Sequence, residues 1–103
     1  MHLEWSVFAR ADRRTNFDHI EADNPRAAVA IDERIRARVE GLAQFPEMGR
    51  FGRIEGTREL VISGTPYIAA YRIVGETVRI LRVLHGAQQW PDEMPEGPEE
   101  HSR

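Results

Sequence analysis

The feature that most constrains the fold is the stretch 57–91, which predicts three consecutive β-strands. Its apolar segments are rich in Val, Ile, Leu and Tyr, residues that suit a pleated and half-buried surface. Short turns separate the segments, and the two-residue loop Gly75-Glu76 is typical of a tight hairpin. The stretch therefore predicts an antiparallel sheet with strands at 58–63, 67–74 and 77–85.

A pair of helices is predicted before this sheet. Residues 2–7 alternate as a short strand, and Ser6 can cap a helix over about 7–22. Asn24-Pro25 supplies an N-cap and a first-turn proline for a second helix that runs to about Ala43. This helix has an apolar stripe formed by Ala28, Ile31, Ile35, Val39 and Leu42. Such a hairpin has to bury its stripes against the sheet.

The predicted fold class is α+β, in the order β-α-α-β-β-β, with the helix hairpin on one face of a twisted antiparallel sheet. One domain covers residues 1–91. The connection 46–57 is rich in glycine and is expected to hold a short strand near Arg53–Glu55. Residues 92–103 are rich in acids, Pro and Gly, and we expect a disordered tail.

Composition excludes several classes of protein. Cysteine is absent, which removes disulfides, thiol nucleophiles and Cys-ligated zinc and suits the cytoplasm. No apolar run approaches the roughly 20 residues of a membrane span, and no signal-peptide pattern begins the chain. The tail holds five acids and one Arg, so 17 acids and 14 bases become 12 and 13 in the domain. A domain this close to neutral is not expected to bind nucleic acid directly.

The hairpin turn also predicts the strand register. If Val74 pairs with Thr77, Arg72 lies opposite Arg79 and Ala69 lies opposite Arg82. The face expected beneath the helices contains Leu60, Ile62, Tyr67, Ala69, Tyr71, Ile73, Val78, Ile80 and Leu84, with Arg58 and Arg82. The open face contains Val61, Ile68, Ala70, Val74, Leu81 and Val83, interrupted by Glu59, Ser63, Arg72, Arg79 and His85. Its mixture of apolar and charged residues predicts a binding surface.

Two readings of the opposed Arg72 and Arg79 stay open. Like charges that face each other destabilise a hairpin, so Glu59, Glu76 or water could screen them. Alternatively, the pair forms an anion clamp for a partner's carboxylate or for a phosphate. Arg58 and Arg82 are expected to pair with helix acids such as Asp12 or Glu40.

The remaining candidate residues lie near the end of the last strand. His85 suits either a hydrogen-bonded structural role or catalysis. Trp90 is expected to cover a sheet edge or to join a partner surface. The four His residues are too dispersed to predict a metal site, and no nucleotide-binding or catalytic motif indicates a cofactor. The proposed partner-binding residues are therefore Glu59, Arg72, Arg79, His85 and Trp90.

Blocks of residues along the chain are similar to those of a known family. They are Trp5, Asn24-Pro25, Ala27-Ala28, Phe45-Pro46, Gly49-Arg50, Thr57-Arg58-Glu59-Leu60, Pro66-Tyr67-Ile68, Tyr71-Arg72, and Ile80–Gly86 with Trp90. In these blocks the chain resembles the RelE/ParE superfamily of bacterial type II toxins, over about residues 3–91. Arg13 and Asn16 depart from the aliphatic residues usual in the family's first helix. The resemblance implies a toxin that an antitoxin from the same operon neutralises.

The family divides into two mechanisms. RelE-like members cut mRNA in the ribosome, whereas ParE-like members inhibit DNA gyrase without acting as nucleases themselves. RelE-like nucleases resemble one another in an Arg after the Tyr of the first sheet turn, basic residues after the last strand, and a Tyr or His in the tail. Here the first two positions correspond to Ile68, Ala87 and Gln88, and the tail has no Tyr.

The ParE-like reading is therefore favoured. It predicts a non-enzymatic gyrase inhibitor held by a ParD-like antitoxin. We expect the antitoxin to lay an amphipathic segment over the helix hairpin or the open face and to contribute acids to Arg72 or Arg79. The alternative is a ribosome-dependent endoribonuclease that uses Arg72, Arg79 and His85. A third reading is a degenerate binding module without toxicity.

Overall fold

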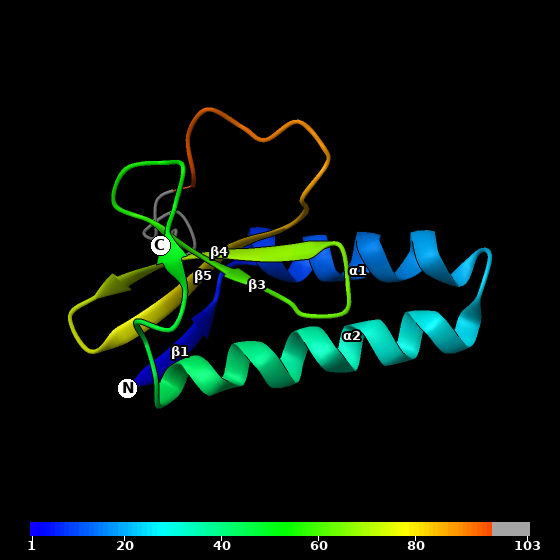
Figure 1. Cartoon of the computed structure of the whole chain (residues 1–103), viewed down its shortest axis with the longest axis horizontal. Helices are drawn as coiled ribbons and strands as arrows, with labels where there is room; N and C mark the ends of the chain where they lie inside the picture. Colours follow the sequence, from blue (N-terminus) through cyan, green and yellow to red (C-terminus); the bar gives the residue numbers. More distant parts are fainter. Residues whose placement is uncertain (96–103) are drawn as a thin grey trace.

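The computed structural model describes residues 1–95 and contains two helices beside a sheet (Figure 1). In chain order the elements are β1 (His2–Trp5), α1 (Val7–Glu21), α2 (Pro25–Glu40), a short 3₁₀ turn η1 (Gly41–Ala43), β2 (Arg50–Phe51), β3 (Arg58–Val61), β4 (Tyr67–Val74) and β5 (Thr77–His85). None of the described helices is both long and apolar enough to cross a membrane.

Both helices begin at the predicted caps. The Ser6 hydroxyl accepts a hydrogen bond from the Ala9 N–H at 2.9 Å. The Asn24 side chain accepts one from the Ala27 N–H at 3.1 Å, with Pro25 at the first helical position. These bonds satisfy N–H groups that have no partner within the helix. Local sequence thus determines where each helix starts.

The sheet has five strands in the order β1-β5-β4-β3-β2, and the helices pack on one face (Figure 1). The predicted α+β arrangement is confirmed. The sheet is mixed rather than purely antiparallel, because β1 pairs parallel to β5. The short strand in the glycine-rich connection is Arg50–Phe51, so its predicted position near Arg53–Glu55 is wrong.

The predicted register is correct near the turn and wrong beyond an irregularity in β5. Val74 pairs with Thr77 and Arg72 with Arg79, as expected. Ala70 pairs with Arg82 but Tyr71 pairs with Ile80, so β5 bulges at the extra residue Leu81, and Ala69 pairs with Val83 rather than with Arg82. Since a shift of one residue exchanges the faces of a strand, Val83, Leu84 and His85 change sides.

The main core lies between the helices and the sheet. Its buried members are Ala9, Ile35, Val39, Leu42, Leu60, Ile62, Tyr67, Ala69, Tyr71, Val78, Ile80 and Val83. Leu3 and Trp5 of β1 pack against it. Val83 was predicted on the open face and lies here because of the bulge.

A second apolar cluster covers part of the opposite face. Ala70, Leu81, Leu84 and Met94 form it, with Ile54 and Trp90 packed alongside. Leu84 was predicted beneath the helices and lies here instead. Met94 is 5% exposed, so packing extends past residue 91. The predicted disordered tail falls largely on 96–103, outside the described residues.

Candidate partner-binding site

The two opposed arginines of the open face have different surroundings. Arg79 Nε donates to Glu4 Oε1 at 2.8 Å, and the Arg79 side chain is only 16% exposed. Glu4 is the register partner of Arg79 on β1, which explains the contact. The Arg72 guanidinium makes no ion pair or hydrogen bond with any residue in 1–95. Only one arginine of the predicted clamp is therefore available to a partner.

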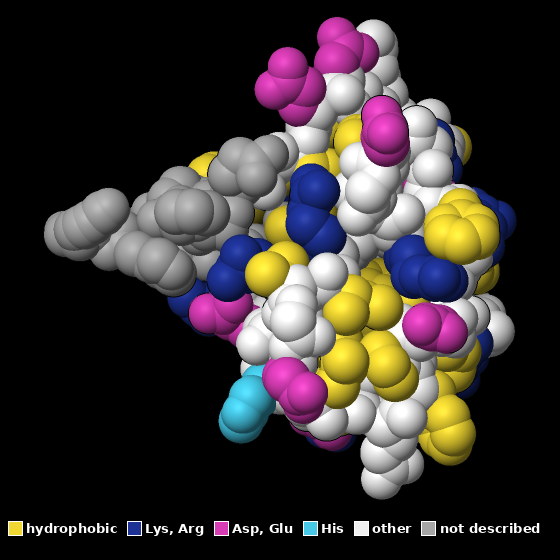
Figure 2. All heavy atoms as spheres, turned by 90° about the vertical axis from the view of Figure 1, so that its left-hand side faces the viewer, with side chains coloured by type: hydrophobic (Ala, Val, Ile, Leu, Met, Phe, Trp, Pro, Cys, Tyr) yellow, Lys and Arg dark blue, Asp and Glu magenta, His cyan; other side chains and the backbone are white. Residues whose placement is uncertain are grey.

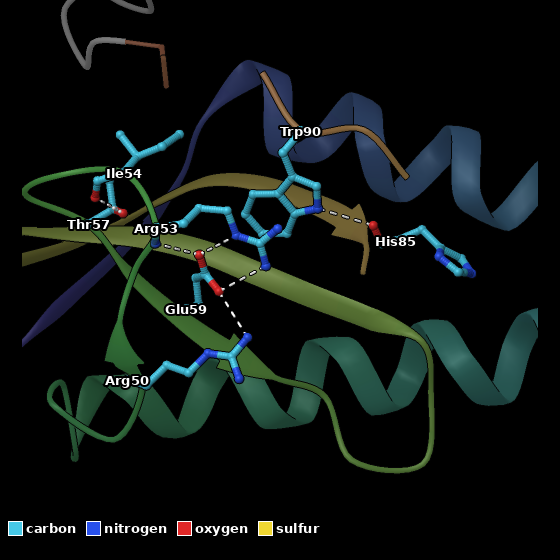
Figure 3. A network of polar contacts seen from close by, with 7 residues as sticks. All are labelled: Arg50, Arg53, Ile54, Thr57, Glu59, His85 and Trp90. Atoms are coloured by element: carbon cyan, nitrogen blue, oxygen red, sulfur yellow. Dashed lines mark hydrogen bonds and ion pairs between the residues drawn. The ribbon is translucent and has the colours of Figure 1, made fainter. Parts of the chain in front are cut away.

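Glu59 organises the open face around one carboxylate (Figure 3). Its Oε1 accepts from Arg50 Nη2 at 3.0 Å, and its Oε2 accepts from the backbone N–H and Nε of Arg53, both at 2.9 Å. Burial opposes the charged form, but the bonds from Arg53 and Arg50 outweigh it and hold the pKa of Glu59 below its ordinary 4.5. Glu59 thus stays ionised and ties the segment 50–53 to β3.

Trp90 contacts the network around Glu59 through Arg53. The Arg53 guanidinium stacks 3.6 Å from the centre of the Trp90 ring, and Trp90 Nε1 donates to the His85 carbonyl at 3.2 Å. Figure 3 shows Arg53 between the Trp90 ring and the Glu59 carboxylate. Trp90 therefore covers the sheet face rather than a sheet edge. Both Glu59 and Trp90 are engaged in intramolecular contacts.

His85 lies away from the arginines. It pairs with Tyr67 at the far end of β5, and its ring meets the Tyr67 ring edge-on, with centroids 5.5 Å apart. Its Nδ1 accepts a hydrogen bond from the Ala87 N–H at 3.0 Å. His85 is six residues from Arg79 along the strand, a span of about 20 Å. The structure does not bring His85 together with Arg72 and Arg79.

Polar residues of α1 hold the free part of β5, which β1 accompanies only as far as Ile80. Arg82 pairs with Asp12 at 2.7 Å, as predicted, and Asp12 also accepts from the Val83 N–H at 2.8 Å. Asn16 donates to the Val83 carbonyl. The unusual Asn16 therefore replaces a strand neighbour, which sequence reasoning missed.

Arg13, the other unusual residue of α1, joins the two helices. It makes a two-point pair with Asp32 of α2 at 2.9 and 2.8 Å and lies over the Trp5 ring.

Arg58 does not pair with a helix acid, contrary to the prediction. Its Nη1 donates to the carbonyls of Gly49 at 2.8 Å and Glu47 at 3.4 Å. Its guanidinium lies 4.5 Å from the centre of the Phe51 ring. Phe51 is 81% exposed, more than any other large apolar side chain described, and sequence reasoning did not select it. Its position between Arg50 and Arg53 in a glycine-rich segment was the available signal.

Within residues 1–95, no group of three His, Asp or Glu side chains is arranged to hold a metal ion. The described part of the site offers arginine and apolar side chains rather than a set of acids and bases.

Comparison with known proteins agrees with this fold. The family model described as ParE toxin of the type II toxin-antitoxin system parDE matches residues 3–90. The Y4kP protein of Sinorhizobium fredii is 51% identical over 91 residues, covering 86% of this chain and 92% of that protein. Toxin RelE2 of Caulobacter vibrioides is 33% identical over 84 residues, covering 82% and 93%.

A solved structure is also similar. It is that of the chromosomal ParDE TA (toxin-antitoxin) system from P. aeruginosa, and its matching chain gives a TM-score of 0.78 at 30% identity. The match covers 82% of this chain and 95% of that chain.

Proposed function

Because the chain belongs to the ParE toxin family of type II toxin-antitoxin systems, we propose that it arrests growth by binding DNA gyrase. In this proposal it acts in the cytoplasm, and a ParD-like antitoxin neutralises it by direct binding. It needs no cofactor and breaks no covalent bond itself.

One observation carries the choice of a binding mechanism. RNA cleavage through the 2′-hydroxyl needs a base, an acid and a cation around one phosphate. The candidate residues are separated: His85 packs beside Tyr67 of the main core, and Arg79 lies about 20 Å along β5 in a pair with Glu4. Arg72 makes no hydrogen bond or ion pair with an acid or a base among the described residues. This arrangement favours binding to a protein over cleavage of RNA.

A supercoiling assay tests the proposal. Purified toxin is added to DNA gyrase and relaxed plasmid, and we expect loss of supercoiling or a stabilised cleavage complex. Addition of antitoxin should restore activity. Unchanged supercoiling at a large excess of toxin contradicts the gyrase target.

The alternative function is a ribosome-dependent endoribonuclease. It is favoured by the name of a relative at 33% identity, toxin RelE2. Mapping mRNA ends after induction distinguishes the two mechanisms, because a RelE-like enzyme produces new cuts in phase with codons. The gyrase proposal predicts no such cuts. A third outcome, absence of growth arrest without antitoxin, indicates a binding module only.

A further inference from the structure

A hollow lined by both polar and apolar groups opens at the end of the sheet, beside the β4–β5 hairpin. It has a volume of about 230 Å³ and is lined by Phe51, Gly56, Thr57, Arg58 and Ile73. Phe51 forms an exposed wall, and Ile73 is partly buried against the main core. Figure 2 shows hydrophobic side chains gathered on this side of the molecule, with basic side chains beside them. These basic side chains are all arginines, because the chain has no lysine. The space suits one large apolar side chain.

A second hollow, which is predominantly apolar, lies at the segment that precedes β2. It measures about 520 Å³ and is lined by residues 44–48, including Phe45 at 63% and Met48 at 37% exposure. The hydrogen bond from Arg58 to the Glu47 carbonyl links the two hollows. Exposed apolar side chains therefore recur at positions 45, 48 and 51, which suits an extended or helical segment better than a small molecule.

Two arginines border the first hollow without a carboxylate. Arg58 is held over the Phe51 ring by backbone carbonyls. Arg72 lies beside Gly56, where a Cβ atom would come within 3.0 Å of Arg72 Nη1. Within residues 1–95, neither guanidinium has an acid within ion-pair distance, whereas Arg13, Arg50, Arg53, Arg79 and Arg82 all do. The local surface thus combines apolar contacts with uncompensated positive charge.

We propose that this surface, the two hollows with Arg58 and Arg72, docks an acidic apolar segment of the antitoxin. A large apolar side chain enters the Phe51 hollow, and neighbouring carboxylates pair with Arg72 and Arg58. Charge complementarity favours an acidic segment, because arginine forms two-point bonds with carboxylate groups. The apolar floor at Ile73 favours a peptide side chain over a phosphate backbone. The proposal rests on the proposed function for the existence of the antitoxin and names where it binds.

Binding of the antitoxin to toxin variants tests this site. The probe is the purified product of the short reading frame adjacent to the toxin gene, titrated into the full-length toxin by calorimetry. Phe51→Ser and Arg72→Glu alter the surface, and both residues are accessible enough to change without disrupting the core. Val29→Ser at 54% exposure and Arg14→Glu at 82% side-chain exposure are the matched controls on the helices. Circular dichroism verifies that each variant is folded.

We expect Phe51→Ser and Arg72→Glu each to raise the Kd by about tenfold or more, as is usual for a central contact. The controls should stay within about twofold of wild type. Wild-type affinity in both site variants overturns the proposal, and so do equal losses in the controls. Loss of growth arrest with unchanged antitoxin affinity also overturns it, because the surface then belongs to the target.

The supercoiling assay with wild-type toxin separates this result from the choice of target. If gyrase is unaffected while both site variants bind the antitoxin weakly, the docking site stands and the gyrase target fails.

Discussion

The two faces of the sheet are covered in different ways. On one face, α1 and α2 bury a continuous apolar core that includes Tyr71 and Ile80, both without measurable exposure. On the other, a smaller cluster depends on a loop and on the chain after β5, and the Glu59 carboxylate holds that loop to β3. The first cover is made of regular elements with an apolar stripe. The second is assembled from segments that have no stripe of their own.

This difference has consequences for stability and binding. Removing apolar surface from water stabilises the helix-covered face, and that contribution hardly depends on pH. The opposite face relies on a charge-assisted network whose arginine partners are about half exposed. We therefore expect the second cover to open before the molecule unfolds as a whole.

The largest expected effect is a loss of stability when a side chain in one of the two apolar clusters is shortened. Ile80→Ala should lower the free energy of unfolding by about 2–5 kcal/mol, because a cavity remains in a packed core. Met94→Ala, in the second cluster, should cost about 1–2 kcal/mol, since the terminal segment can detach locally. Urea denaturation measures both. Equal losses would show that the two covers form one cooperative unit.

A smaller effect is expected when the network loses its charge. Glu59→Gln should lower the free energy of unfolding by about 1–2 kcal/mol, because Gln carries no charge and leaves Arg50 and Arg53 only one of the two acceptor oxygens. Trp90 fluorescence, recorded in a Trp5→Phe background, should shift toward that of an exposed indole. An unchanged spectrum would mean that Trp90 is held without Arg53.

The same network predicts a pH dependence. The pKa of Glu59 is lowered in the folded state, so its stabilising contribution is complete above about pH 4.5 and is lost as the pH falls through the folded pKa. In the Trp5→Phe background, Trp90 fluorescence should therefore change below that pH, whereas the same protein with Glu59→Gln should show no corresponding step. Parallel titrations of the two proteins make the comparison, since other carboxyl groups titrate in both.

The smallest effect concerns a feature that belongs to neither face. Asn24→Ala removes the N-cap of α2 and should lower the thermal midpoint slightly, with a cost of about 0.5–1 kcal/mol. Asn24 is exposed, so a loss as large as that of Ile80→Ala would contradict a purely local role.

Features encoded by neighbouring residues could be predicted from sequence. Ser6 and Asn24 cap their helices, and the turn Gly75-Glu76 specifies the pairing of Arg72 with Arg79. The resemblance likewise anticipated the family and the order of elements. Of the candidate site, Arg72 remains available to a partner, but Arg79, Glu59 and Trp90 are occupied within the chain.

Pairs of distant residues could not be predicted in the same way. Asp32 was free to pair with Arg36 on its own helix, yet it binds Arg13 of the other helix, while Arg36 binds Glu33 and Glu40. Arg13 also lies over the Trp5 ring of β1, and from there its guanidinium makes a two-point pair with Asp32 across the helix hairpin.

By itself, the sequence determined the helices, their caps and the turn-proximal register, because each depends on contacts between residues close in the chain. Only the tertiary structure decided the bulge in β5 and the partners of Arg79 and Glu59. β1 stops beside Ile80, and polar side chains of α1 bond the rest of β5, which allows an extra residue there. That shift exchanged the faces of Val83 and Leu84, since side chains alternate along a strand.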